Sequence, residues 1–509
     1  MNNKVSRRAF LGTTATAAAA FTVIPSNAMG SVLGHKAPSD KLNIAVVGPG
    51  GRAGGVLNAA KPTENIVALC DVDWKKAAGQ FGNNPNAKQY KDYRKMFDEM
   101  GKSIDAVIIG TADHTHCIIA AQAITLGKHV YVEKPLTHSV YESRLLTKLA
   151  AKYKVATQMG NQGSSQIGVR QVCDWITDGV IGDVKRVDTF TDRPIWPQGL
   201  NTPKQPQWVP ETLDWDLFTG PAQMIPYHSV YHPWNWRGWW AYGTGALGDM
   251  ACHIMHPIFK ALHLGYPTKV QGSSTMLLVD CAPVAQSVRY IFPARNIPAN
   301  KKVKYPEVEV NWYDGGIKPV MPPGWPAGKN MNDAGGACIF YGTKDILVCG
   351  CYGVNPWLLS GKTPNSPKTQ REVPQITRPG RNGEPQVDDT ATHTMDWVRA
   401  CKERPENRVE TASNFSEAGP FNEMVVMGVL AVRLQGLNKE LEWDGNNMKF
   451  TNIGDDETIT WIVEDRFNVN DEGHPVINPI RSPRMNAKAT AEELIKHTYR
   501  AGWSLPDMP

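Results

Sequence analysis

The sequence predicts an α/β protein in two parts, and three observations support that prediction. A glycine-rich turn separates two apolar runs near residue 50. Apolar runs then alternate with helix-length segments up to residue 162, and strand-like runs dominate after residue 186. The alternating pattern is typical of a parallel sheet covered by helices. At 509 residues, of which 41% are hydrophobic, the chain is also too long for one compact domain.

The N-terminal segment predicts an export signal. The paired arginines Arg7 and Arg8 precede a mildly apolar stretch, and small residues end that stretch at Ala28. This order of a basic start, an apolar middle and a cleavage site resembles a bacterial twin-arginine signal, with an ordinary secretory leader as the alternative. We therefore expect residues 1–28 to be a signal peptide, residues 29–40 to be a linker, and the mature protein to work in the periplasm.

The charge of the chain argues against two classes of partner. The formal net charge is +5, but Lys4, Arg7 and Arg8 belong to the leader, and without them the charge is +2. A charge this small gives no general attraction to nucleic acid or to an acidic membrane surface. No apolar run reaches the roughly 18 residues that a membrane-spanning helix needs. We expect a small-molecule partner instead.

A strand, a glycine-rich turn and a helix start together predict a nucleotide-binding unit. The apolar run 44–47 leads into Gly48, Gly50, Gly51 and Arg52. The first of these glycines permits a tight turn, the second lets the backbone approach a pyrophosphate, and the N–H groups of the following helix face the phosphates. A Gly-rich surface turn is the alternative, but the strand before it and the acid that follows favour the nucleotide.

The residue that ends the second apolar run predicts the kind of dinucleotide. Asp71 follows the run 66–70 and can accept hydrogen bonds from an adenosine ribose. Asp73 adds a second acid at this edge, and two carboxylates should repel a 2′-phosphate. We expect NAD rather than NADP, although Lys75 and Lys76 work in the opposite direction.

Two further strand ends carry polar residues. The apolar run 104–110 reads as a buried parallel strand, and ligands bind at the carboxyl ends of such strands. The next strand, 129–132, ends in Glu133 and Lys134 before a proline. A lysine beside a nicotinamide ring can donate a hydrogen bond to a substrate oxygen and stabilise charge during hydride transfer, and Glu133 can hydrogen-bond a ribose hydroxyl. A solvated Glu–Lys pair is the alternative. The expected cofactor contacts beyond the glycine turn, Arg52 and Asp71 are Thr111, His116, Glu133, Lys134, Asn161 and Gln162.

Together, the glycine turn, Asp71, the turn 111–116 and Glu133-Lys134-Pro135 resemble the Gfo/Idh/MocA family of oxidoreductases, named for glucose–fructose oxidoreductase and inositol dehydrogenase. One departure is Ala112, where the family usually has proline. The resemblance implies a Rossmann domain over residues 41–162. Over residues 163–485 it implies an α/β domain with a large open, mostly antiparallel sheet. We expect residues 486–509 to form a C-terminal helix and tail that pack back on the body. We also expect a homo-oligomer, a dimer or tetramer, that forms through the open sheet.

An aspartate and a histidine in the second half complete the predicted chemistry. Asp249 and His253 are four residues apart, so on a helix they share a face. Histidine can take or return a proton near neutrality, and the aspartate can orient it or bind a substrate hydroxyl. The resemblance implies that Lys134, Asp249 and His253 form the catalytic set. The alternatives are purely structural roles, or a metal site with His256; that spacing matches no strong zinc pattern, so we expect no metal.

A loop rich in tryptophan predicts the substrate class. Seven of the sixteen tryptophans lie between residues 195 and 241, among prolines and glycines and without helical or strand periodicity. Such a segment is typical of a functional loop. Flat rings beside planar hydrogen-bonding groups suit the apolar faces and hydroxyl rims of a sugar, and a merely structural loop is the alternative. The expected substrate contacts are Arg193, Trp196, Tyr227, His232, Trp236 and Arg237.

The sequence therefore favours an oxidoreductase that transfers hydride between tightly bound NAD and a hydroxyl or ketone of a sugar or glycoside. A second hypothesis is an NAD-dependent glycosidase or lyase, which would oxidise the sugar transiently with no net redox change. A third is a nucleotide-retaining binding protein without turnover, and the presence of Lys134, Asp249 and His253 together argues against it. Nothing in the sequence separates the first two.

Overall fold

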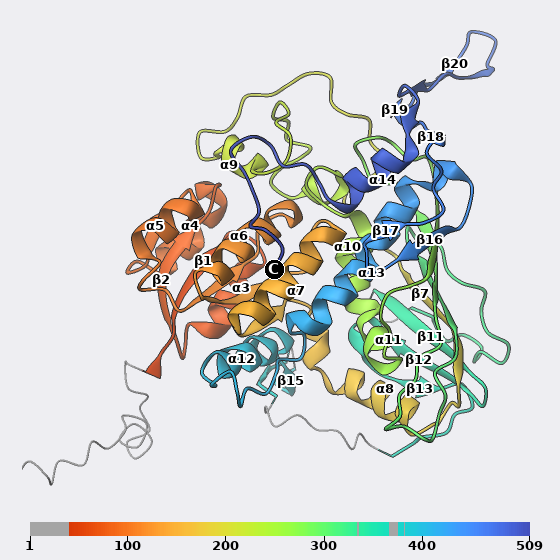
Figure 1. Ribbon diagram of the computed structural model, residues 1–509, viewed down its shortest axis with the longest axis horizontal. Coiled ribbons are helices and arrows are strands. Elements are labelled where there is room, and N and C mark those ends of the chain that lie inside the picture. Colours follow the sequence, from red (N-terminus) through yellow and green to blue (C-terminus); the bar gives the residue numbers. More distant parts are fainter. Residues whose placement is uncertain (1–39, 333–334, 366–374, 381) are drawn as a thin grey trace, which may run out of the picture.

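The N-terminal part of the chain is a parallel sheet with helices on both faces (Figure 1). The computed structural model describes residues 40–332, 335–365, 375–380 and 382–509, so the expected signal peptide and all but the last residue of the expected linker lie outside the described residues. Six strands run in the order β3-β2-β1-β4-β5-β6, and each neighbouring pair is parallel. The strands are β1 (Asn43–Val47), β2 (Asn65–Cys70), β3 (Lys88–Tyr90), β4 (Ala106–Ile109), β5 (His129–Val132) and β6 (Thr157–Met159). This is the predicted Rossmann arrangement, and that prediction is confirmed.

Local sequence explains where the helices of this part begin. The Asp73 side chain accepts hydrogen bonds from the backbone N–H groups of Lys75 and Lys76, which starts α4. Ser139 and Glu142 form a reciprocal capping box at the start of α7. The helices are α3 (Ala53–Ala60), α4 (Trp74–Asn83), α5 (Tyr93–Met100), α6 (Asp113–Thr125) and α7 (Val140–Tyr153).

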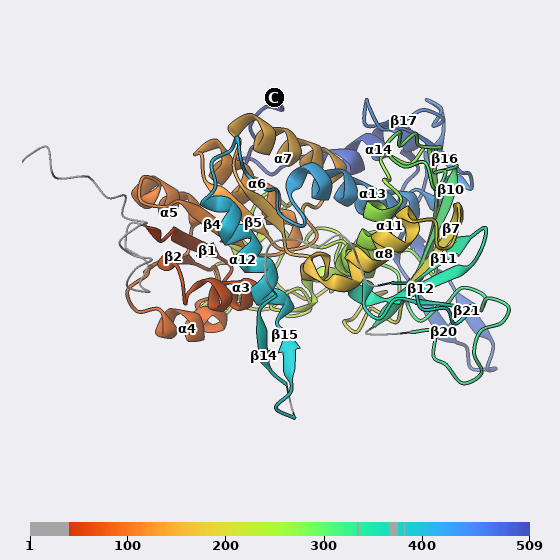
Figure 2. The same ribbon diagram turned by 90° about the horizontal axis from the view of Figure 1, so that it is seen from below.

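A helix from late in the sequence also covers this sheet. Helix α12 (Asp389–Cys401) packs beside α3 (Figure 2). Its Trp397 is fully buried, with its ring centroid 5.8 Å from that of Tyr131 on β5. The core of the nucleotide-binding half therefore includes residues that lie far beyond its expected boundary at residue 162.

The second part is built on a mixed sheet of nine strands, in the order β13-β12-β11-β7-β10-β9-β8-β16-β17. Among its described strands, β7 and β10 form the one parallel pair. The strands are β7 (Val184–Thr191), β8 (Lys269–Ser274), β9 (Gln286–Phe292), β10 (Val308–Tyr313), β11 (Gly336–Gly342), β12 (Ile346–Gly350), β13 (Trp357–Leu358), β16 (Leu441–Asp444) and β17 (Lys449–Phe450). The large, mostly antiparallel sheet that the resemblance implied is confirmed.

Helices fill the space between the two sheets, as Figure 2 shows. They are α8 (Ile167–Thr177), α10 (Gly245–Ile254), α11 (His256–Ala261) and α13 (Phe415–Arg433). The two parts are joined by polar contacts as well, since Asp113 at the start of α6 accepts hydrogen bonds from the backbone and hydroxyl of Thr244. These contacts hold the start of α10 at the carboxyl edge of the parallel sheet.

Shorter elements complete the described structure. They are η2 (Gln162–Ser165), α9 (Trp215–Thr219), η3 (Asn235–Gly238), η4 (Cys351–Gly353), η5 (Gln435–Leu437) and α14 (Ala487–Ile495). Four two-stranded sheets are formed by β14 (Thr377–Pro379) with β15 (Pro385–Val387), β18 (Thr458–Ile459) with β23 (Met485–Asn486), β19 (Ile462–Glu464) with β22 (Ile480–Arg481), and β20 (Phe467–Val469) with β21 (Pro475–Ile477). The β20–β21 hairpin projects away from the body (Figure 1). None of the described helices is both long and apolar enough to cross a membrane.

Candidate active site

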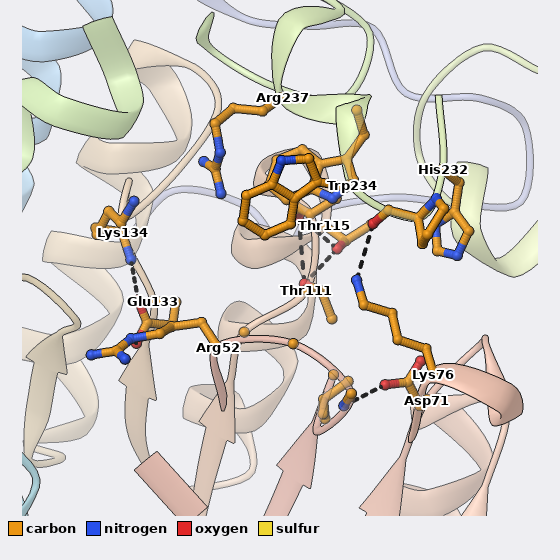
Figure 3. Close-up of a pocket in the computed structure, with 18 of the residues that line it drawn as sticks. Arg52, Asp71, Lys76, Thr111, Thr115, Glu133, Lys134, His232, Trp234 and Arg237 are labelled. Carbon is orange, nitrogen blue, oxygen red and sulfur yellow. Dashed lines mark hydrogen bonds and ion pairs between the residues drawn. The ribbon is translucent and has the colours of Figure 1, made fainter. Parts of the chain in front are cut away.

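A cavity of about 740 Å³ lies along the carboxyl edge of the parallel sheet. Strand ends of the first part form one wall, and α10 with the tryptophan-rich loop 193–240 forms the other. Figure 3 shows Lys134 and Glu133 on one side of this cavity and Asp71 and Lys76 on the other. The cavity therefore joins the predicted nucleotide-binding turn to the predicted catalytic set.

The glycine turn is fixed by close packing. Gly48 has a φ of +81°, and a Cβ there would lie 2.7 Å from the carbonyl oxygen of Gly110. A Cβ on Gly50 would lie 2.9 Å from the backbone of Lys76. Helix α3 begins directly after the turn, without a side-chain cap among the described residues. The turn and the helix start leave a cradle that suits an anionic pyrophosphate.

Asp71 holds the tip of β2 in place. Its two carboxylate oxygens accept hydrogen bonds from the backbone N–H groups of Gly50 at 3.0 Å and Asp73 at 2.9 Å. Burial raises the pKa of Asp71 to about 6, although these two N–H groups and the charge of Lys76 oppose the rise. The carboxylate lines the cavity, where it can receive a ribose hydroxyl.

Two contacts attach the tryptophan-rich loop to the edge of the nucleotide-binding half. His232 Nε2 lies 2.8 Å from Asp73 Oδ2, and Lys76 Nζ donates to the carbonyl oxygen of Pro233 at 3.0 Å. Burial lowers the pKa of Lys76, while the neighbouring Asp71 and Asp73 charges raise it. As a result the loop covers the cavity, and Trp234 lies over it (Figure 3).

The predicted catalytic set comes together at the other end of the cavity. Lys134 Nζ lies 2.5 Å from Asp249 Oδ1, and Arg237 Nη1 lies 3.1 Å from the same oxygen. Burial alone would raise the pKa of Asp249, but the charges of Arg237 and Lys134 outweigh it and hold that pKa well below its usual range. Asp249 is therefore an ionised anchor for two cations.

His253 lies on the same helix as Asp249 and also lines the cavity. Burial, reinforced by the charge of Lys134, holds the pKa of His253 well below its usual range. Its Nδ1 has no hydrogen-bond partner among the described residues, and its ring centroid lies 4.8 Å from that of Tyr352. The imidazole is therefore neutral, and among the neighbouring charges only that of Asp249 favours its protonation.

Glu133 is buried beside this set. Its Oε2 accepts a hydrogen bond from the backbone N–H of Lys134, and its Oε1 lies 3.8 Å from Arg52 Nε without a hydrogen-bond partner in the described chain. Burial raises the pKa of Glu133, and the Arg52 charge opposes the rise. An unpartnered oxygen here is suited to a ribose hydroxyl.

Most of the predicted site residues line this one cavity. They are Gly48, Gly50, Gly51, Arg52, Asp71, Thr111, Glu133, Lys134, Gln162, Arg193, Trp196, His232, Trp236, Arg237, Asp249 and His253. They come from both halves of the chain, and the contacts between the halves bring them together.

Three predicted residues do not line the cavity. The two ring nitrogens of His116 lie 2.8 Å from the carbonyl oxygen of Pro135 and 3.2 Å from that of Thr111, so this histidine links the segments that follow β5 and β4. Asn161 is buried and donates to the carbonyl of Cys252 at 3.3 Å. Tyr227 packs its ring edge-on against Trp215, in an aromatic cluster that the loop itself forms.

Other lining residues were not predicted. Tyr352 reaches the cavity from η4, more than 200 residues from Lys134, and no local motif marks it. Trp503 reaches it from the C-terminal tail. His256, proposed above as a possible metal ligand, instead lies 2.7 Å from Glu417. The described residues contain no group of three or more His, Cys, Asp or Glu side chains that could hold a metal.

The comparison with family models agrees with this geometry. Residues 42–161 match the NAD-binding Rossmann fold of the Gfo/Idh/MocA oxidoreductase family, and residues 167–288 match its C-terminal α/β domain. These are the two parts whose contact creates the cavity. Residues 42–288 are therefore similar to both domains of the Gfo/Idh/MocA oxidoreductases, and the first part of the chain is an NAD-binding Rossmann domain.

Individual relatives are distant. The chain is 28% identical over 167 residues to glycosyl hydrolase family 109 protein 1 of Akkermansia muciniphila. The matched segment covers 30% of this chain and 34% of that protein. It is 24% identical over 229 residues to levoglucosan dehydrogenase of Pseudarthrobacter phenanthrenivorans, covering 42% and 49% respectively. The chain thus spans about half or less of these two relatives.

A solved structure shares the fold. It is an inositol dehydrogenase homolog from Azotobacter vinelandii, complexed with NADH and myo-inositol, with a TM-score of 0.51 and 14% identity. The match covers 79% of this chain and 98% of that one.

Proposed function

We propose that the protein is an oxidoreductase that transfers hydride between tightly bound NAD and a hydroxyl or ketone of a sugar or glycoside. The observation that supports this most strongly is the cluster of Lys134, Asp249 and His253 in the wall of the cavity. A proton acceptor and a charged hydrogen-bond donor beside a dinucleotide site are what alcohol oxidation needs.

The residues that line the cavity fit NAD. The close-packed glycine turn and the start of α3 suit the pyrophosphate, the Asp71 carboxylate suits the adenosine ribose, and the unpartnered Glu133 Oε1 suits the second ribose. When bound, NAD supplies the acceptor for the hydride. This chain contributes the orientation of the substrate and the movement of its proton.

The three polar side chains then divide the work. Lys134 donates a hydrogen bond to the substrate oxygen, and its ionic contact with Asp249 fixes where the ammonium points. His253 lines the cavity and takes the hydroxyl proton in oxidation, with the Asp249 carboxylate stabilising the imidazolium, and it returns the proton in reduction. Arg237 shares Asp249 with Lys134, so the aspartate stays ionised throughout. The residues are thus arranged to move one proton as one hydride moves.

The loop above the cavity supports a carbohydrate substrate. The guanidinium of Arg237 lies 4.4 Å from the ring centroid of Trp236 and 5.7 Å from that of Trp196, so flat rings and hydrogen-bond donors alternate over the site. Sugars present apolar C–H faces and hydroxyl rims to such a surface. The names of levoglucosan dehydrogenase and the inositol dehydrogenase homolog point to the same class of substrate.

A direct experiment tests this function. The purified protein, with no nucleotide added, is mixed with a panel of sugars and glycosides, and the fluorescence of bound NADH is recorded. We expect at least one sugar to reduce the bound cofactor. A protein that holds NAD but reduces none of it with any sugar, polyol or glycoside would contradict the proposal.

A second candidate is an NAD-dependent glycosidase, and the similarity to a glycosyl hydrolase over 167 residues favours it. Such an enzyme would oxidise the sugar, cleave the glycosidic bond and return the hydride. An aryl glycoside separates the two candidates. Release of the aglycone without accumulation of ketone would favour the glycosidase, and ketone without aglycone would favour the dehydrogenase.

We also propose that the protein is exported to the periplasm through residues 1–28. The paired arginines Arg7 and Arg8 before an apolar stretch support this. Replacing both arginines by lysine should leave the protein in the cytoplasm, as measured by cell fractionation. Equal periplasmic amounts of the variant and the native protein would contradict it.

We also propose that the protein is a homo-oligomer, a dimer or tetramer, that forms through the open sheet. The β20–β21 hairpin, which lies outside that sheet, supports association in general, because its paired side chains Phe467 and Ile477 are 61% and 69% exposed. An isolated two-stranded hairpin with an apolar face is marginal in water. Light scattering after size exclusion should give a dimer or tetramer, and a monomer at micromolar concentration would contradict the proposal.

A further inference from the structure

The C-terminal tail, which lies outside both segments that match the family models, contributes one residue to the lining of the cavity. Trp503 lines the cavity together with Asp71, Val72, Lys91 and Tyr93. These residues surround the tip of β2, the place where an acidic residue receives the adenosine ribose in this type of fold. Trp503 therefore faces the adenosine end of the cavity, away from Lys134 and His253.

The tail is held firmly before it reaches this point. The Tyr499 hydroxyl donates to Glu142 Oε1 at 2.6 Å, which joins the tail to α7. The Arg500 backbone N–H donates to the carbonyl of Pro221 at 2.9 Å, and its guanidinium bonds to Asp216 at 2.6 Å. The tail thus crosses between the nucleotide-binding half and the tryptophan-rich loop, and Figure 1 shows its course from α14 past α9.

The Trp503 ring also contacts side chains at the start of α5. The Arg94 guanidinium lies 4.3 Å from the centroid of the Trp503 ring, and the Tyr93 ring centroid lies 6.4 Å away. Beyond it, Leu505 and Met508 pack against the main hydrophobic core. Because the chain is anchored on both sides of Trp503, its ring is held at the edge of the cavity at little further entropic cost.

We infer that Trp503 is a cofactor-binding residue that packs on the adenosine moiety of NAD, so that the C-terminal tail slows release of the nucleotide. The inference rests on the proposed NAD-dependent function and names a residue that no dinucleotide motif contains. Aromatic rings stack on nucleobases with an energy that corresponds to roughly 10- to 100-fold in affinity. A strap that must be displaced before the adenosine can leave acts on the dissociation rate.

Exchange of bound nucleotide tests the inference. The purified holoenzyme is mixed with excess isotope-labelled NAD in the absence of any sugar, and release of the original NAD is followed over time. We expect Trp503→Ala to release NAD roughly 10- to 100-fold faster than the native protein, and Trp503→Phe to lie between them. The control is Trp208→Ala, since the Trp208 side chain is 97% exposed and does not line the cavity.

Fragments of the cofactor distinguish an adenosine contact from a general loosening of the tail. ADP-ribose should compete with labelled NAD more weakly in Trp503→Ala than in the native protein, while nicotinamide mononucleotide should compete equally in both. An exchange rate within twofold of native, or equal weakening of both fragments, would overturn the inference. The readout needs no turnover, so failure to oxidise any sugar would count against the proposed function alone.

Discussion

Replacing Lys134 by methionine isolates the charged donor from the rest of the site. The substitution keeps the length and apolar stem of the side chain and removes the ammonium group. In the native protein the Lys134 side chain is 14% exposed and its Nζ lies 2.5 Å from Asp249 Oδ1, so little water competes for the ammonium group. Loss of a group that acts on the reacting oxygen in such a site typically lowers the rate by roughly 10²- to 10⁴-fold, which is about 3–5 kcal/mol of transition-state stabilisation.

The effect on folding should be much smaller than the effect on catalysis. Removing one member of a buried ion pair usually costs about 3–5 kcal/mol because the other charge is left alone. Here Asp249 keeps Arg237 at 3.1 Å, so its charge stays paired in the variant. We therefore expect a loss of unfolding free energy of only about 1–2 kcal/mol, and unchanged NAD content.

The assay is single-turnover reduction of the bound NAD by a sugar that the native protein oxidises. Lys148→Met is the matched control, because Lys148 is an exposed residue of α7. Lys134→Met should be slower by at least 10²-fold while the control stays at the native rate. If Lys134→Met reduces its cofactor within a few-fold of native, the role given to this lysine is wrong.

Two further predictions concern Asp71 and His114. Asp71→Ala should lower the amount of NAD that copurifies with the protein, because the adenosine ribose loses its hydrogen-bond acceptor. The nucleotide extracted from the native protein should be mainly NAD. An extract that contains mostly NADP would contradict the preference for NAD inferred from Asp71 and Asp73. Burial lowers the pKa of His114 in the folded protein to about 3. As pH falls from about 6.5 toward 3, the His114 imidazole therefore becomes protonated in the unfolded chain but not in the folded one, and the free energy of unfolding decreases. Over that range the free energy of unfolding of His114→Asn, measured by urea titration, should fall less steeply than that of the native protein, by about 1.4 kcal/mol per pH unit. Parallel plots of unfolding free energy against pH for the variant and the native protein would contradict this prediction.

The nucleotide-binding half could be predicted from the sequence because its signals are local. Gly48, Gly50 and Asp71 lie within one strand–turn–helix–strand unit, and the spacing alone places them at the edge of a parallel sheet. Asp249 and His253 are likewise one helical turn apart. In each case the chemistry and the geometry are contained in a short stretch of chain.

Residues that depend on tertiary contacts could not be predicted in this way. Tyr352 enters the cavity because η4 follows β12 toward α10, and its left-handed backbone, with a φ of +66°, carries no mark in the sequence. His116 fits the motif but turns toward two backbone carbonyls. Helix α12 joins the core of a domain whose sequence ends more than 200 residues earlier. Only the packing of distant segments decides these outcomes.

Transfer of deuterium tests the central claim most directly. A sugar or glycoside that reduces the bound NAD is labelled with deuterium at the oxidised carbon and incubated with the purified protein in the absence of added nucleotide. We expect the label to move onto the bound cofactor and then into a second product or back to its original carbon, with no free NADH in solution. A strict requirement for added NAD, with stoichiometric release of NADH, would contradict it.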